Sequence, residues 1–205
     1  MFCMDLESLS VESTCVVLSI SMIHVDGDKL PKDNTKAYYQ MLDSACTVKF
    51  NASEQIKAKR HVDKNTVDWW VKQCEPAKEM SFYPLNSDKS VAEGSAILHE
   101  WFYTFPNAKN LPIWVRGSMD QPAYSSLLRS NGLPDLAPYN NFRDVRTAVE
   151  LLYPDSKGGY VDVPNFDTAN VIKHMPNHDV AYDLLMLLRG DQIPFDYFRH
   201  PVTVL

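Results

Sequence analysis

The sequence lacks an excess of positive charge. Lys and Arg total 20 against 26 Asp and Glu, which gives a net charge of −6. Proteins that bind nucleic acid through bulk electrostatics are usually basic, so this composition disfavours a tight, non-specific nucleic-acid binder. It does not disfavour an enzyme whose acidic cleft takes up divalent cations, because bound ions dominate the local field.

Cysteines and long apolar runs are also scarce. The four cysteines form no C-x-x-C pair, so we expect reduced thiols in a cytoplasmic protein and no zinc site. The most apolar run, 15–25, is too short and too polar to span a bilayer, and Asp5 interrupts any apolar leader. We therefore expect no signal peptide and no membrane partner.

Glycine occupies only seven positions, and 45% of the 205 residues are hydrophobic. This composition argues against global disorder and predicts a single domain over residues 1–205. Apolar periodicity predicts strands over 2–7, 14–25, 45–50 and 111–115. It predicts helices over 65–73, 90–105, 120–129, 143–153 and 177–188, with a turn at 26–28 and Gly190 as the last helix stop. The resulting fold class is α/β, a mixed β-sheet flanked by α-helices.

Two carboxylates stand at alternate positions of the first predicted strand. Asp5 and Glu7 therefore point to the same face of the sheet. They repel each other unless a cation such as Mg²⁺ or Mn²⁺ neutralises them. The alternative is an exposed strand face, because the D-x-E spacing is common.

Two further elements add polar groups. Asp120 follows the strand 111–115, where carboxylates often reach a cleft, although a helix-start acid explains it equally well. His178 and Asp183 are five residues apart at the start of the last predicted helix. They share one site only if His178 lies in the loop or the first turn, and a solvated helix start is the alternative.

As an ordered set, these motifs resemble the DEDDh 3′–5′ exonucleases of the DnaQ-like, RNase H-like superfamily. The segments 66–73 (TVDWWVKQ), 113–117 (IWVRG) and 143–147 (RDVRT) look like the phage DexA-like branch, which also contains bacterial exoribonucleases. The resemblance covers residues 2 to about 190. It implies an RNase H-like fold and, for a phage-encoded chain, a place in the host cytoplasm.

The resemblance also implies the site and its chemistry. Two Mg²⁺ or Mn²⁺ ions would be held by Asp5, Glu7, Asp120 and Asp183, with His178 as the general base and His174 as its nearest alternative. The partner would be the 3′ end of a single-stranded nucleic acid, with DNA favoured and RNA as the alternative. A catalytically weak nucleic-acid-binding module on the same fold is the other alternative, which the intact carboxylates and His178 disfavour. The oligomeric state is left open. Substrate contacts are expected from Leu6, Ser8, Trp69, Trp70, Met119 and Arg146, although both tryptophans equally fit a stripe packed on the sheet.

Overall fold

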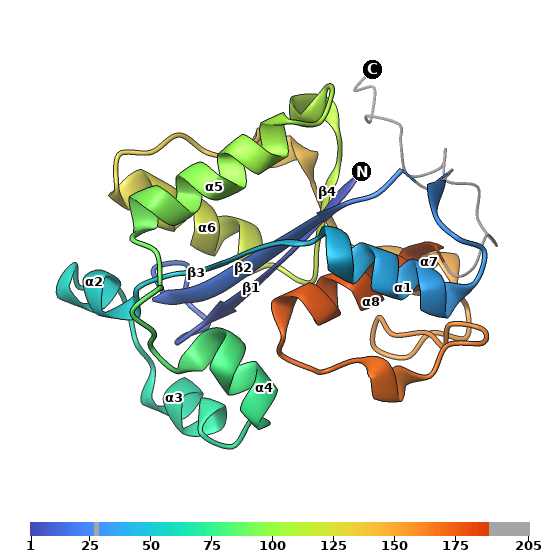
Figure 1. Cartoon of the computed structure of the whole chain (residues 1–205), viewed down its shortest axis with the longest axis horizontal. Helices are drawn as coiled ribbons and strands as arrows, with labels where there is room; N and C mark the ends of the chain where they lie inside the picture. Colours follow the sequence, from blue (N-terminus) through green and yellow to red (C-terminus); the bar gives the residue numbers. More distant parts are fainter. Residues whose placement is uncertain (27–28, 189–205) are drawn as a thin grey trace.

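The computed structural model describes residues 1–26 and 29–188 and contains a five-stranded sheet in the order β3-β2-β1-β4-β5 (Figure 1). The strands are β1 (Phe2–Ser8), β2 (Val17–His24), β3 (Cys46–Lys49), β4 (Ile113–Val115) and β5 (Phe142–Asp144). β2 pairs antiparallel with both β1 and β3, whereas β1–β4 and β4–β5 are parallel. The first strand of the chain is therefore the central strand of a mixed sheet.

Helices cover both faces of this sheet. The α-helices are α1 (Asn34–Ser44), α2 (Ala52–Lys57), α3 (Lys64–Trp70), α4 (Glu75–Ala77), α5 (Val91–Tyr103), α6 (Asp120–Ser130), α7 (Val145–Leu152) and α8 (Pro176–Leu188). Shorter turns are η2 (Lys78–Phe82), η3 (Ala108–Asn110), η4 (Tyr139–Asn141) and η5 (Thr168–Asn170). In Figure 1, α5 and α6 lie on one side of the sheet, and α1, α7 and α8 lie on the other.

The alternation of side chains along β1 determines which helices each residue meets. Phe2, Met4 and Leu6 belong to the apolar cluster under α5 and α6. Met1 and Cys3 belong to the cluster under α1, α7 and α8. Asp5 and Glu7 continue the second series, so their carboxylates lie on the face that α8 covers.

A third, smaller cluster lies under α3 and α4. It contains Leu9, Val16, Leu18, Ala77 and Trp70. Trp70 is fully buried, its indole Nε1 donates to the Ser8 carbonyl at 2.9 Å, and its ring stacks on Phe82. This residue is therefore part of the core.

The predicted α/β class and its main elements are confirmed, with local differences. The helix predicted over 143–153 begins only at Val145, because Asp144 ends β5 and its side chain accepts from Thr147 N at 2.6 Å as a helix cap. α1, α2, α4 and β5 were not predicted. Two residues of the predicted turn, Gly27 and Asp28, and the predicted stop Gly190 lie outside the described residues. Within residues 1–26 and 29–188, no helix is long and apolar enough to cross a membrane.

Candidate active site

A cavity of about 590 Å³ opens beside the carboxyl-terminal half of β1. The acids lining it are Asp5, Glu7, Asp120, Asp179 and Asp183. The cations lining it are Arg116, Arg146, Lys173 and His174 if protonated. The three segments that carry the predicted metal ligands, β1, α6 and α8, therefore line one cavity, and α8 contributes two carboxylates, Asp179 and Asp183, where only Asp183 was predicted.

Secondary structure positions each of these acids. Asp5 and Glu7 lie on β1, whose register shifts after Glu7, an irregularity that commonly borders active sites. Asp120 is the first residue of α6, just beyond the end of β4. Asp179 and Asp183 are one turn apart on α8, so both face β1.

Burial and mutual repulsion perturb all of these carboxyl groups. Burial, followed by repulsion from Asp183, raises the pKa of Asp120 to about 8 and that of Asp179 to about 7. Burial is also the main cause of the raised pKa of Asp5 and of Glu7, with neighbouring acids adding to it. The protein alone therefore favours protonated acids here, which is the situation that a bound cation reverses.

The donor atoms fit a hard divalent cation. Asp120 Oδ2 is buried and has no hydrogen-bond partner among the described residues. One ligand atom each from Glu7, His174 and Asp179 lies within 4.8 Å of the others. Carboxylate oxygens are the ligands that Mg²⁺ and Mn²⁺ prefer, so the cavity has the chemistry of a site for such ions.

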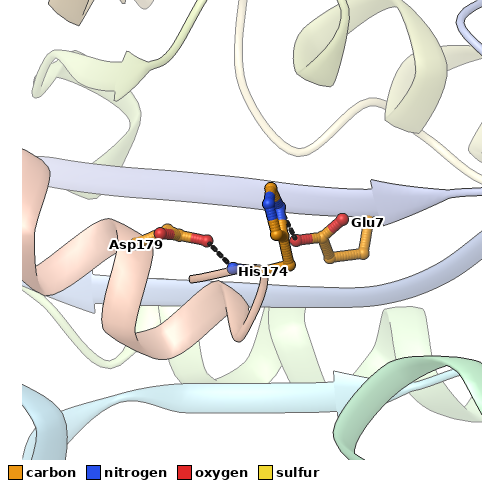
Figure 2. Close-up of side chains that lie close together, drawn as sticks. All are labelled: Glu7, His174 and Asp179. Atoms are coloured by element: carbon orange, nitrogen blue, oxygen red, sulfur yellow. Dashed lines mark hydrogen bonds and ion pairs between the residues drawn. The ribbon is translucent and has the colours of Figure 1, made fainter. Parts of the chain in front are cut away.

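His174 faces Glu7 from the loop before α8 (Figure 2). Its Nδ1 lies 3.9 Å from Glu7 Oε1, and its backbone N–H donates to Asp179 Oδ2 at 2.8 Å. Its backbone is left-handed, with φ of 64°. Burial lowers the pKa of His174, and Lys173 lowers it further. The lowered pKa favours the neutral ring, which can accept a proton.

His178 is the third residue of α8 and lies in its first turn, the place that the spacing to Asp183 requires. It is not among the described residues that line the cavity. Its Nδ1 hydrogen-bonds the Tyr38 hydroxyl at 2.6 Å and accepts from Ile172 N at 3.3 Å, so this side of the ring faces α1.

Asp183 lines the cavity, and its carboxylate is bound by Arg116. Arg116 Nε and Nη2 lie 2.8 and 2.7 Å from Asp183 Oδ1. The same guanidinium donates to the Gly159 carbonyl at 3.1 Å and lies over the Tyr160 ring at 4.2 Å. Arg116 therefore joins α8 to the loop that follows α7 and balances part of the acidic charge. Arg116 belongs to the segment 113–117 that carries part of the family resemblance, but no role was predicted for it.

The predicted substrate contacts divide into two groups. Leu6 and Arg146 line the cavity. Trp69 is 39% exposed, and its ring meets that of His174 edge-on at 4.6 Å. The remaining three, Ser8, Trp70 and Met119, are not among the described lining residues. Ser8 Oγ donates to the Ser10 carbonyl, Met119 packs on the core, and Trp70 is buried.

The fold and the acidic cavity together define a class, the metal-dependent nucleases with an RNase H-like fold. Residues 1–187 match the model of the 3′-5′ exoribonuclease Rv2179c-like domain family, and the chain belongs to this family. It is also 25% identical to an exodeoxyribonuclease of Enterobacteria phage T4, over 91% of this chain and 86% of that protein. The protein is a 3′–5′ exonuclease, an enzyme class that uses divalent metal ions.

Proposed function

We propose that the chain acts as a single exonuclease domain that removes nucleotides from the 3′ end of single-stranded DNA with the help of two Mg²⁺ or Mn²⁺ ions. The observation that carries this proposal is the group of buried carboxylates on β1, α6 and α8, which converge on one cavity with raised pKa values. Such a group is stable in its charged form only around cations.

Asp5, Glu7, Asp120 and Asp183 are the proposed metal ligands, and all four line the cavity. Arg116 binds Asp183 through Oδ1, so Oδ2 can still face a cation. Asp179, one turn earlier on α8, shares a ligand cluster with Glu7 and is a further candidate ligand.

His178 is the proposed general base, and His174, which lines the cavity beside Glu7, is the alternative. A pair of divalent ions, when bound, activates water and stabilises the charge on the attacking and leaving oxygens. The histidine takes the proton of the attacking water. The bond from phosphorus to the 3′ oxygen of the preceding nucleotide breaks, which releases a nucleoside 5′-monophosphate and leaves a new 3′ hydroxyl.

Three other side chains are suited to hold the terminal nucleotide. Arg146 and Lys173 line the cavity and can neutralise phosphate. Trp69 stands beside His174 with its ring partly exposed, which suits stacking on a base of any identity.

The preference for single strands rests on the size of the site. A cavity of about 590 Å³ is in the range that holds one small molecule, so it accepts a terminal nucleotide and excludes a duplex. A paired end must first fray, which costs a few kcal/mol. DNA is proposed because the phage relative is an exodeoxyribonuclease. RNA is the second candidate, because the family model describes exoribonucleases.

Matched 5′-labelled and 3′-labelled DNA and RNA oligonucleotides, single-stranded and annealed, test this function. We expect the 5′ label to yield a ladder shortening from the 3′ end and the 3′ label to yield a mononucleotide at once. Single-stranded DNA should be digested fastest, and Asp5→Asn should be inactive. Mononucleotide release from the 5′ end would contradict the polarity, and faster digestion of RNA would make the exoribonuclease function the correct one.

A further inference from the structure

Arg116 places a positive charge beside the proposed metal ligands. It lines the same cavity as they do. Only 13% of its side chain is exposed, against 6% for the side chain of its ion-pair partner Asp183. A positive charge so close to a ligand repels a divalent ion, and burial strengthens that repulsion. Arg116 therefore benefits metal binding only if it contributes something that outweighs the repulsion.

The contribution is visible in how the guanidinium holds Asp183. Arg116 Nε and Nη2 lie 2.8 and 2.7 Å from Asp183 Oδ1, so both contacts end on the same oxygen. A planar guanidinium that donates twice restricts the rotation of the carboxylate about its last bond. Oδ1 is thereby turned toward Arg116, and Oδ2 is left as the oxygen that a cation can reach.

The guanidinium is itself fixed by contacts away from Asp183. Arg116 Nη1 donates to the Gly159 carbonyl at 3.1 Å, and the guanidinium carbon lies 4.2 Å from the centre of the Tyr160 ring. Nη2 lies 4.0 Å from the sulfur of Met186. With these contacts on its other sides, Arg116 can act as a rigid support for the carboxylate.

Both ends of this support belong to ordered backbone. Arg116 directly follows β4, and the next amide, Gly117 N–H, donates to Asp144 Oδ2 at 2.6 Å. Gly159 lies in a tight turn in which Lys157 N–H donates to the Tyr160 carbonyl at 2.8 Å. The Gly159 carbonyl is therefore a fixed acceptor for the guanidinium.

We propose that Arg116 is a positioning residue for the metal ligand Asp183. By holding Oδ1, it keeps the carboxylate in the orientation that presents Oδ2 to a bound ion. Residues that orient a metal-binding carboxylate in this way typically change metal affinity or activity by roughly 10–100-fold. The inference rests on the proposed function, in which Asp183 is a ligand. It states that this orientation outweighs the repulsion between the guanidinium and the ion.

Titration of Mn²⁺ into the metal-free, full-length chain, followed by calorimetry, separates the two effects by sign. Arg116→Met removes both the charge and the donors. We expect its Mn²⁺ affinity to fall by roughly 10–100-fold, although a repulsive charge has been removed. At saturating Mn²⁺, kcat should also be lower, with little change in KM for the oligonucleotide. Arg116→Lys keeps the charge but replaces the planar fork by one ammonium, so its loss should be intermediate.

Arg129→Met is the matched control. Arg129 Nη2 lies 2.6 Å from Asp135 Oδ2 in a comparable ion pair, and neither residue is among the described residues that line the cavity. This variant should bind Mn²⁺ as the wild type does. Melting curves in EDTA show whether each variant is folded.

The same substitution in an Asp183→Ala background tests whether the effect passes through Asp183. No carboxylate is left there for Arg116 to orient, so only the repulsion remains. Arg116→Met should then leave the Mn²⁺ affinity unchanged or raise it. An equal loss of affinity in both backgrounds would overturn the proposal.

Other results would also contradict it. Equal or tighter Mn²⁺ binding by Arg116→Met would mean that Arg116 only balances charge, and a raised KM with unchanged Mn²⁺ affinity would make it a substrate-binding residue. If Arg116→Met does not fold, Arg116→Lys decides, because wild-type affinity in that variant would overturn the proposal and weaker binding would support it. A wild type that binds Mn²⁺ but degrades no oligonucleotide would refute the proposed function, and the titrations would still decide the role of Arg116.

Discussion

Replacing Asp120 by asparagine should stabilise the metal-free protein while abolishing its activity. The side chain is buried at the first position of α6, with Oδ2 unpaired among the described residues. Its pKa is raised from 3.8 to about 8. Each pKa unit corresponds to about 1.4 kcal/mol, so the ionised carboxylate costs the fold on the order of 5 kcal/mol at pH 8.

The sign of this effect follows from the direction of the shift. The folded-state pKa lies above the unfolded one, so the acid is protonated in the fold and costs nothing at or below pH 4. The penalty grows as the pH rises from about 4 to about 8 and then levels off. Asparagine has almost the same shape and no charge, so its advantage over aspartate should follow the same curve.

Melting temperatures of both proteins, measured in EDTA between pH 4.5 and pH 8, provide the assay. Even 2 kcal/mol, less than half of the penalty, corresponds to a rise of about 4–8 °C for a chain of this size. In excess Mg²⁺ the wild type should have the higher melting temperature of the two proteins, because Mg²⁺ binding to its folded state stabilises it. Asp43→Asn, on the exposed side of α1, removes the same charge without this burial. A difference between wild type and Asp120→Asn that stays constant with pH would refute the reasoning.

Four further outcomes are expected. EDTA should abolish activity and Mg²⁺ or Mn²⁺ should restore it, so full turnover in excess EDTA would contradict metal dependence. His178→Ala should lower the single-turnover rate by roughly 10²–10⁴-fold, with a loss that shrinks at high pH, and wild-type turnover at neutral pH would exclude it as the base in favour of His174. Gly159→Ala should displace Arg146 and so raise KM, because the φ of Gly159 is +75° and the added Cβ would lie 2.8 Å from Arg146 Cβ. An unchanged KM would indicate that Arg146 does not contribute to substrate binding. Trp70→Ala should lower the free energy of unfolding, measured in urea, by about 3–5 kcal/mol, whereas Trp69→Ala should mainly weaken substrate binding. The reverse result would mean that Trp69 belongs to the core and Trp70 binds substrate.

Much of the acidic site was predictable because it depends on short-range periodicity. Alternation along β1 placed Asp5 and Glu7 on one face, and the apolar run of β4 placed Asp120 at the mouth of the cavity. These positions follow from the pleat of a strand and from where a buried strand ends.

The histidine was harder to place because two overlapping pairs have the same spacing. His174 precedes Asp179 by five residues, as His178 precedes Asp183. The start of α8 leaves His174 in the loop and puts His178 in the first turn of the helix, so the helix boundary is compatible with either pair. Pro176 marks this boundary in the sequence, because proline favours the first turn of a helix.

Contacts between residues far apart in the sequence could not be predicted, for a different reason. Arg116 meets Asp183, and Tyr38 meets His178, across 67 and 140 residues of chain. No periodicity links residues so far apart, and α1, which carries Tyr38, has a weak apolar pattern with only three buried residues. Such pairs can be identified only in the folded structure, where the sheet brings the helices together.

The central position of β1 has a consequence for how the enzyme is made. This strand is synthesised well before its parallel partner β4 and before α8, the helix that covers its acidic face. At roughly 5–20 residues per second, the delay between Asp5 and Asp179 is on the order of ten seconds or more. A growing chain therefore has no assembled catalytic centre until nearly the whole domain has emerged, so partly synthesised copies cannot degrade nucleic acid.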